Sequence, residues 1–373
     1  MLKKALDPAE KVPLAQRIEC LTRAANSYSS ALERNLPSSN MMRMIGGHDQ
    51  RQDRALQERQ VSVETLKANI KMIEEKLDIA TIQQRVLTTV DQSQNVDLEA
   101  DKVDSLRFKL VSVSDLYNDY ACPMNLFDVC LLILNTCHHN DRDNIEILWK
   151  SVICEEILPC QTTSALAISF LTQLKRGSTL EEETILKSGD HGNNLQSFDN
   201  GEWIPRLRNR VATLGAELYG KGADYTLPID LIVYALEGLR QAYNGIHKEN
   251  NLSQPWPIET MLNVGIPFDA LFQSYDSLYL EKDGGLHWLA SILELLKMWV
   301  NEAFLNYDVS PVASSQESNA SSQLARAVKN GALMERIKAY NATLDGLIGE
   351  NAASIDEVKY GFSEVEDAIR KGF

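Results

Sequence analysis

The sequence predicts an all-α protein, an irregular α-solenoid of stacked antiparallel helix pairs with one long helix near the N-terminus. Three observations predict this class. The chain has 373 residues and is 44% hydrophobic, which is enough apolar material for a large packed core. Its 19 glycines and 11 prolines are few for this length, which favours helices over many short strands. Apolar residues recur with a period near 3.6 through most of the chain, without a repeat of fixed length.

The first segment, residues 1–103, is expected to contain the long helix. An amphipathic helix that begins near residue 14 precedes a polar loop at 37–49. Two apolar series then recur every seven residues between 53 and 90, and this spacing predicts a long helix with a heptad-like stripe. The series are Leu56, Val63, Ile70 and Leu77, interleaved with Leu66, Ile73, Ala80 and Leu87. Arg59 and Gln84 interrupt the stripe, which favours a packed helix over a free coiled coil. A polar stretch at 91–104 closes the segment.

The middle segment, residues 104–187, is expected to form helical pairs. Its apolar patterns predict four helices, at 104–118, 124–138, 141–157 and 162–175. Trp149 lies within one of these apolar stripes, which indicates packing in the core. The composition of residues 188–201 predicts a long exposed loop after the segment.

The third segment, residues 202–373, is expected to hold the C-terminal helical pairs, beginning with helices at 202–220 and 228–243. Three helix starts share the order apolar residue, proline, apolar residue, acid, which suits the first helical turn and the positive end of the helix dipole. These starts are Leu227–Asp230, Trp256–Glu259 and Ile266–Asp269. Gly265 is expected to take a positive φ in the tight turn between two helices. An apolar helix at 286–307, a mobile insertion at 310–323 and helices at 324–347 and 354–371 complete the segment.

Charge and composition argue against several classes of function. The chain has 37 Lys and Arg against 52 Asp and Glu, a net charge of −15, and such an acidic chain repels nucleic-acid phosphates. No signal peptide is evident at the N-terminus, and Glu294, Lys297 and Glu302 interrupt the most apolar helix, so no membrane span is expected. The six cysteines form no Cys-x-x-Cys pair and are expected to be reduced core residues in a cytosolic or nuclear compartment.

One stretch has the spacing of a nucleotide-binding loop. Gly215–Gly222 matches a phosphate loop as far as Lys221, but Gly222 stands where the loop needs the Ser or Thr that ligates magnesium. An amphipathic helix precedes the stretch where a strand is required. The preferred interpretation is therefore a helix that ends at its glycines.

Other candidate sites are equally weak. Cys137, His138 and His139 resemble metal ligands, but their spacing to Cys154 and Cys160 does not match a zinc site, so capping of a helix end is favoured. Three adjacent acids at 181–183 point in different directions around a helix and cannot share one pocket. Trp203 and Trp256 flank helix starts, where a packing staple is favoured over a binding anchor. The sequence therefore predicts no catalytic, cofactor-binding or metal-binding residue.

Read together, several stretches resemble a known family. They are Asp115–Phe127, Ile145–Ile153, Leu227–Glu237 and, most distinctively, Trp256–Asp276, which reads WPIETMLNVGIPFDALFQSYD. These stretches are similar to the C-terminal helical part of the large non-repetitive scaffold nucleoporins of the inner ring, of the animal and fungal type. Val12–Ala24 resembles a helix start in the same part of that family, so the resemblance covers nearly the whole chain. The N-terminal β-propeller of the family has no counterpart here, so its membrane contact and linker binding are not carried over.

The resemblance implies a structural component of the nuclear pore complex at the nuclear envelope. Such a component would connect inner-ring subcomplexes, bind linear motifs of flexible, FG-bearing linker nucleoporins, and support nucleocytoplasmic transport of protein and mRNA. It implies no enzyme activity, no cofactor, no small-molecule substrate, no direct nucleic-acid partner and no membrane contact by this segment. Helices between 256 and 373 are the expected place of a motif groove, and the acidic surface favours partners that carry Lys or Arg.

Two other interpretations stay open at this point. Another α-solenoid scaffold, of the vesicle-coat or proteasome-lid type, has the same composition. An enzyme built on helices is also conceivable, with Cys137, His138 or Lys221 active.

Overall fold

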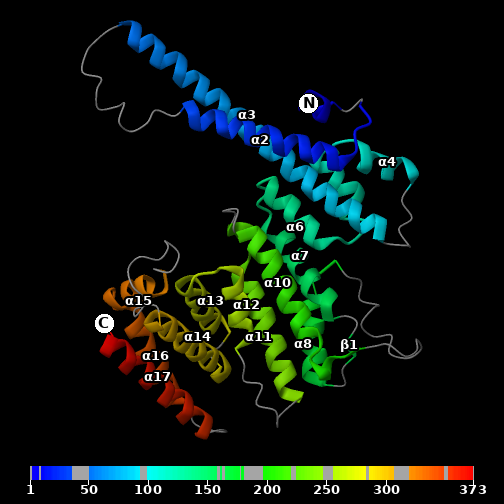
Figure 1. Cartoon of the computed structure of the whole chain (residues 1–373). Helices are drawn as coiled ribbons and strands as arrows, with labels where there is room; N and C mark the ends of the chain where they lie inside the picture. The colour runs from blue at the N-terminus through cyan, green and yellow to red at the C-terminus, as the bar shows by residue number, and fades with distance from the viewer. Residues whose placement is uncertain are drawn as a thin grey trace. The chain divides into compact units, whose positions relative to one another are not determined.

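The architecture is given by a computed structural model of the 373-residue chain (Figure 1). The structure describes residues 2–7, 10–35, 50–92, 99–157, 160–161, 164–176, 178–179, 196–219, 224–246, 255–282, 285–305, 319–347 and 352–372. The chain forms two compact units, Met1–Asn140 and Asp141–Phe373. The division into three segments that the sequence suggests stays a prediction.

The first unit is built around a long helix with a shorter helix packed along it. Its elements are α1 (Leu2–Leu6), α2 (Leu14–Asn35), α3 (Gln50–Gln92), α4 (Ala100–Phe108), α5 (Val113–Asp115), the π-helical turn η1 (Leu116–Ala121) and α6 (Phe127–Thr136). Helix α3 packs against α2, α4 and α6. One predicted seam of its stripe is buried at three of its four positions, since Ile73, Ala80 and Leu87 are at most 7% exposed and Leu66 is partly exposed. The described members of the other seam are also partly exposed; they are Val63, Ile70 and Leu77. The packed long helix expected from the sequence is therefore confirmed.

Two buried polar side chains fasten the connections around α3. Arg17 is fully buried and donates to the carbonyl oxygens of Ala5, Asp7, Glu10, Val12 and Phe108, at 2.5 to 3.1 Å. Gln83, also fully buried, donates to the carbonyls of Leu106 and Lys109 and accepts from the amide of Val111. Because an unsatisfied buried polar group costs about 1–3 kcal/mol, these side chains stabilise the segments that they join.

The helix boundaries of this unit differ from the predicted ones around α4. The predicted helix at 104–118 is divided among three elements, α4, α5 and η1, since α4 ends at Phe108 and Lys109 is extended, with φ −117° and ψ 153°. The polar stretch predicted at 91–104 is partly helical, because α3 runs to Gln92 and α4 begins at Ala100. Gln83 explains the break, because it binds both carbonyls that flank the end of α4. The predicted loop at 37–49 lies outside the described residues.

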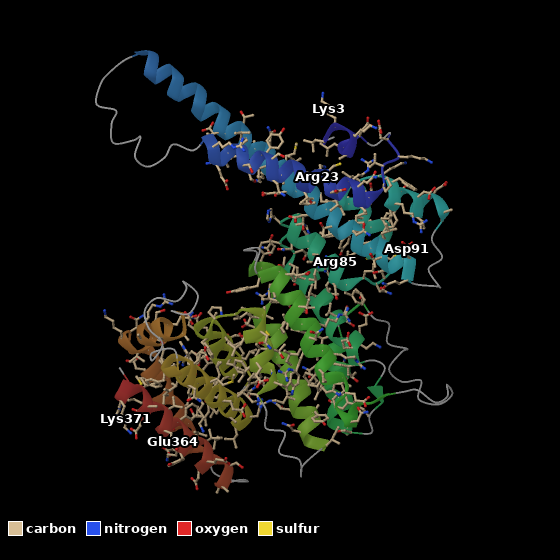
Figure 2. All side chains as sticks on the ribbon, viewed as in Figure 1. Lys3, Arg23, Arg85, Asp91, Glu364 and Lys371 are labelled. Atoms are coloured by element: carbon tan, nitrogen blue, oxygen red, sulfur yellow. The ribbon has the colours of Figure 1, made fainter. Side chains whose placement is uncertain are left out.

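Charged side chains on the outer faces of the first unit pair locally. Arg23 donates to Glu19 at 2.6 Å, and Arg107 donates to Asp91 at 2.6 Å. Figure 2 labels Arg23 and Asp91. All four side chains are about half exposed or more, so each pair contributes about 0–1 kcal/mol.

The second unit is a succession of helices in which near neighbours along the chain pack together. Its elements are α7 (Arg142–Ile157), β1 (Cys160–Gln161), α8 (Ala165–Lys175), β2 (Gln196–Ser197), η2 (Phe198–Asn200), α10 (Trp203–Tyr219), η3 (Asp224–Thr226), α11 (Ile229–Ile246), α12 (Trp256–Val264), α13 (Phe268–Glu281), α14 (Leu286–Leu305), α15 (Asn319–Lys329), α16 (Ala332–Gly346) and α17 (Ala352–Gly372). Helix α7 packs on α8, α11 on α12 and α13, and α14 on α13, α15 and α17. The all-α fold of stacked helices is confirmed, and β1 and β2 add one two-residue parallel pairing within the described residues. Among these residues no helix is both long and apolar enough to cross a membrane.

Three buried tryptophans organise the core of this unit. Trp149, Trp203 and Trp299 are at most 1% exposed. Their indole N–H groups donate to the carbonyls of Thr226, Phe198 and Ala320, at 2.9 to 3.1 Å. Trp203 and Trp256 meet edge to face, with centroids 6.2 Å apart, so these residues pack in the interior as the staple interpretation predicts.

The end of the predicted exposed loop at 188–201 is not exposed. Phe198 is fully buried and stacks on Trp203 with ring centroids 4.8 Å apart. The indole N–H of Trp203 also binds the carbonyl of Phe198, which fixes the short turn before α10. Residues 188–195 lie outside the described part of the chain.

The proline-containing helix starts form as predicted in two respects and differ in a third. Gly265 has φ +97°, the left-handed turn expected between α12 and α13. Pro257 lies in the first turn of α12. Pro267, however, is the extended N-cap of α13, with ψ 152°, and Pro228 likewise precedes the first residue of α11, so neither proline is inside its helix.

The C-terminal helices begin and end differently from the prediction. The helix expected at 324–347 is two helices, α15 and α16, because Gly331 takes φ +73° between them. Residues 319–323 of the predicted mobile insertion are the first turns of α15. Residues 310–318 lie outside the described part of the chain. Helix α17 agrees with the helix predicted at 354–371.

A buried polar network joins α11, α13 and α14. Glu237 is fully buried and accepts hydrogen bonds from Tyr275, at 2.7 Å, and from Arg240, at 2.8 Å. Arg240 also donates to Glu294 at 2.9 Å and to Ser291 at 2.7 Å. Burial raises the pKa of the Tyr275 hydroxyl well above its ordinary value and raises that of the Glu294 carboxyl.

Candidate functional site

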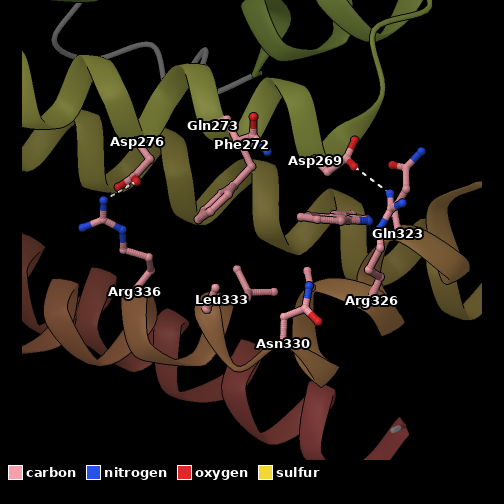
Figure 3. Close-up of a pocket in the computed structure, with 12 residues that line it drawn as sticks. Asp269, Phe272, Gln273, Asp276, Gln323, Arg326, Asn330, Leu333 and Arg336 are labelled. Atoms are coloured by element: carbon pink, nitrogen blue, oxygen red, sulfur yellow. Dashed lines mark hydrogen bonds and ion pairs between the residues drawn. The ribbon is translucent and has the colours of Figure 1, made fainter.

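A pocket of about 310 Å³ lies between α13, α14, α15 and α16 (Figure 3). Its lining residues come from all four helices and combine an apolar floor with a polar rim. They are Asp269, Phe272, Gln273, Asp276, Trp299, Gln323, Arg326, Ala327, Asn330, Ala332, Leu333 and Arg336. Four of them, Gln273, Arg326, Asn330 and Ala332, are exposed, so the pocket is open to solvent.

The floor of the pocket is aromatic. Trp299 of α14 stacks on Phe268 with centroids 5.9 Å apart and contacts Phe272 at 6.4 Å. The bond from the indole N–H of Trp299 to the carbonyl of Ala320 fixes the ring and satisfies its one donor. Phe272 from α13 and Leu333 from α16 point toward each other across the opening (Figure 3). This arrangement leaves an apolar slot with rigid walls.

Two ion pairs close the ends of the slot. Arg326 donates to Asp269 at 3.0 Å at one end, and Arg336 binds Asp276 at 2.7 Å at the other (Figure 3). Asp276 also accepts the hydroxyl of Tyr340 at 2.6 Å, and burial raises the pKa of that hydroxyl above its ordinary value. Each aspartate on α13 is thus neutralised by an arginine on α15 or α16, so the rim carries no net charge.

One buried acceptor in the lining has no donor. Gln323 is 6% exposed, and within the described residues its Oε1 is buried and accepts no hydrogen bond. A buried acceptor without a donor costs about 1–3 kcal/mol, and native proteins leave few of them. This acceptor is enclosed in the wall of the pocket, so the surface that the pocket offers lies between the two ion pairs and is mainly apolar.

The lining is suited to binding and not to acid–base or nucleophilic chemistry. Its described residues include no Ser, Cys, His or Lys side chain, and the two carboxylates among them are paired with arginines. Among the described residues no three His, Cys, Asp or Glu side chains gather as metal ligands. A volume of about 310 Å³ is at the small end of the range of about 300–1,000 Å³ for ligand pockets, and it accommodates one or two side chains.

The residues that the sequence singled out for chemistry lie elsewhere. Cys137 and His139 follow α6 and are exposed, and His138 takes φ +52° there. The backbone N–H groups of His138 and His139 donate to the carbonyls of Asn135 and Leu134, which caps the helix as predicted. Lys221, Gly222 and the acids at 181–183 lie outside the described residues, while Gly215 is inside α10.

The described cysteines differ in burial. Cys130 and Cys154 are buried, and burial raises the pKa of their thiols to about 12 and about 11. Cys20 is partly buried, whereas Cys122 and Cys137 are exposed, so the expectation that all six are core residues is wrong for Cys122 and Cys137. The side chain of Cys160 lies outside the described residues.

The prediction of no catalytic, cofactor or metal residue stays a prediction.

The pocket lies within the helices at 256–373 that were expected to carry a groove, but sequence reasoning missed most of its residues. The sequence predicts Gln323 in a mobile insertion and Arg326 and Arg336 on one continuous helix. The dipeptide Asn330-Gly331 is a turn signal that could have divided this helix. With the break in place, the two arginines fall on separate helices that both face α13.

Comparison with known proteins gives a consistent result. A family model described as non-repetitive/WGA-negative nucleoporin C-terminal matches residues 3–338. Nuclear pore complex protein Nup154 of Drosophila melanogaster is 35% identical over 107 residues, which are 28% of this chain and 8% of that protein. Probable nucleoporin C890.06 of Schizosaccharomyces pombe is 23% identical over 239 residues, 60% of this chain and 15% of that protein. The chain thus matches only a small part of the length of these relatives.

Solved structures share the fold at low sequence identity. The Chaetomium thermophilum Nup170 C-terminal domain, in a complex with Nup145N, superposes with a TM-score of 0.60 at 16% identity, over 98% of this chain and 58% of that one. A second structure of that domain gives a TM-score of 0.57 at 16% identity, over 99% of this chain and 60% of that one.

Proposed function

This chain belongs to the family of non-repetitive/WGA-negative nucleoporins, and we propose on that premise that it is a structural scaffold of the nuclear pore complex. In this proposal the chain lies at the nuclear envelope, in the inner ring of the pore, and supports nucleocytoplasmic transport of protein and mRNA. It acts by binding and carries no catalytic centre. Its partners are other nucleoporins, both scaffold subunits and the linear motifs of flexible linker nucleoporins.

The match of the family model to residues 3–338 is the observation that carries this proposal. The match spans parts of both compact units. It also includes every described residue that lines the pocket, because the last of them along the chain is Arg336. The similar Nup170 domain was solved in a complex with another nucleoporin, Nup145N, which supports a nucleoporin partner for this chain as well. The pocket between α13 and α16 supports a peptide as the form of that partner, because its described lining is apolar between two ion pairs and has no nucleophilic side chain.

Affinity capture tests the proposal. Immobilised residues 1–373 are incubated with nuclear-envelope extract at physiological salt, and the retained proteins are identified by mass spectrometry. Inner-ring and linker nucleoporins are the expected result. An unrelated helical protein of equal negative charge serves as the control, because a net charge of −15 retains basic proteins without specificity.

Three results would contradict the scaffold role at the pore. They are retention of vesicle-coat subunits, retention of proteasome-lid subunits, and retention of nothing beyond the acidic control. In each case the family relationship would reflect shared helical architecture and not a shared role.

A further inference from the structure

We draw no further inference here: the strongest candidate, the buried ammonium group of Lys175 at the end of α8, has no hydrogen-bond acceptor among the described residues, and because residues 180–195 lie outside them nothing in the structure shows which group meets its charge.

Discussion

Arg17 donates two hydrogen bonds to the carbonyl oxygen of Phe108, a residue 91 positions further along the chain. The same guanidinium binds four carbonyls of the N-terminal segment, so one side chain holds the start of the chain against the end of α4. A guanidinium has five N–H donors in a planar fork, which suits a cluster of carbonyl oxygens.

Replacement of this arginine should destabilise the first unit. Arg17→Lys keeps the charge but offers fewer donors in a different geometry, so buried carbonyls are left without partners. We expect a loss of about 2–4 kcal/mol in the free energy of unfolding, measured by urea denaturation followed by circular dichroism. Arg23→Lys is the control, since Arg23 is exposed and its ion pair with Glu19 is also exposed, and it should change stability by less than about 0.5 kcal/mol. Equal effects of the two substitutions would show that the carbonyl cluster contributes no stability.

Removal of the charge on Glu237 should lower the free energy of unfolding of the second unit. Glu237→Gln leaves Arg240 buried beside a neutral amide, although Glu294 still accepts one of its bonds. Breaking a buried pair by removing one partner costs about 3–5 kcal/mol, and we expect a value near the lower end. Thermal unfolding monitored at 222 nm measures the change. Glu357→Gln, on an exposed position of α17 beyond its first turn, should leave the midpoint unchanged.

A glycine pair tests the turn that separates α15 from α16. Gly331→Ala should destabilise by about 1–2 kcal/mol, because Gly331 has φ +73° and a Cβ there is strained even though nothing lies within 4 Å of it. Gly346→Ala is the matched control, since Gly346 lies in the helical part of α16 at negative φ with equal open space. The control should be neutral or stabilising by up to about 1 kcal/mol. If denaturant titrations gave the same change in the free energy of unfolding for both substitutions, that result would argue against a left-handed turn at Gly331.

Thiol reactivity should follow burial. At pH 8 an alkylating reagent is expected to modify Cys122 in the folded chain, while Cys130 and Cys154 react only after denaturation. Their raised thiol pKa values, about 12 and about 11, leave almost no thiolate at this pH. Peptide mapping by mass spectrometry distinguishes the sites. Rapid modification of Cys130 or Cys154 in the folded protein would show that these helices open readily.

The same two thiols should make the protein less stable in alkali. The pKa of each thiol is raised in the folded state, so the unfolded chain loses its proton first as pH rises, and stability falls between about pH 9 and the folded-state pKa. For Cys154 this window ends at about pH 11, and the slope is about 1.4 kcal/mol per pH unit for one thiol. Denaturation at several pH values should show that the free energy of unfolding falls less steeply with pH in Cys154→Ala than in the parent, whereas Cys122→Ala should behave like the parent. An unchanged pH dependence in Cys154→Ala would show that the buried thiol is not its cause.

Local signals in the sequence predicted the helices, because apolar residues three, four and seven positions apart mark the face that a helix buries. The stripe at Ile73, Ala80 and Leu87 and the positive φ of Gly265 are of this kind. The errors fell where a turn signal was overlooked, at Asn330-Gly331, or where a distant side chain ended a helix, as Gln83 does after Phe108.

By itself the sequence determined that the chain is helical, that its surface is acidic and that its stretches resemble a nucleoporin scaffold. The tertiary structure alone decided that Arg17 reaches Phe108, that Glu237 meets Tyr275, and that Asp269 and Asp276 of one helix pair with arginines on two others. These partners are 38 to 91 residues apart along the chain. No short-range pattern encodes such distances, because only the packing of whole helices brings these side chains together. The pocket is likewise a consequence of four helix faces meeting around Trp299.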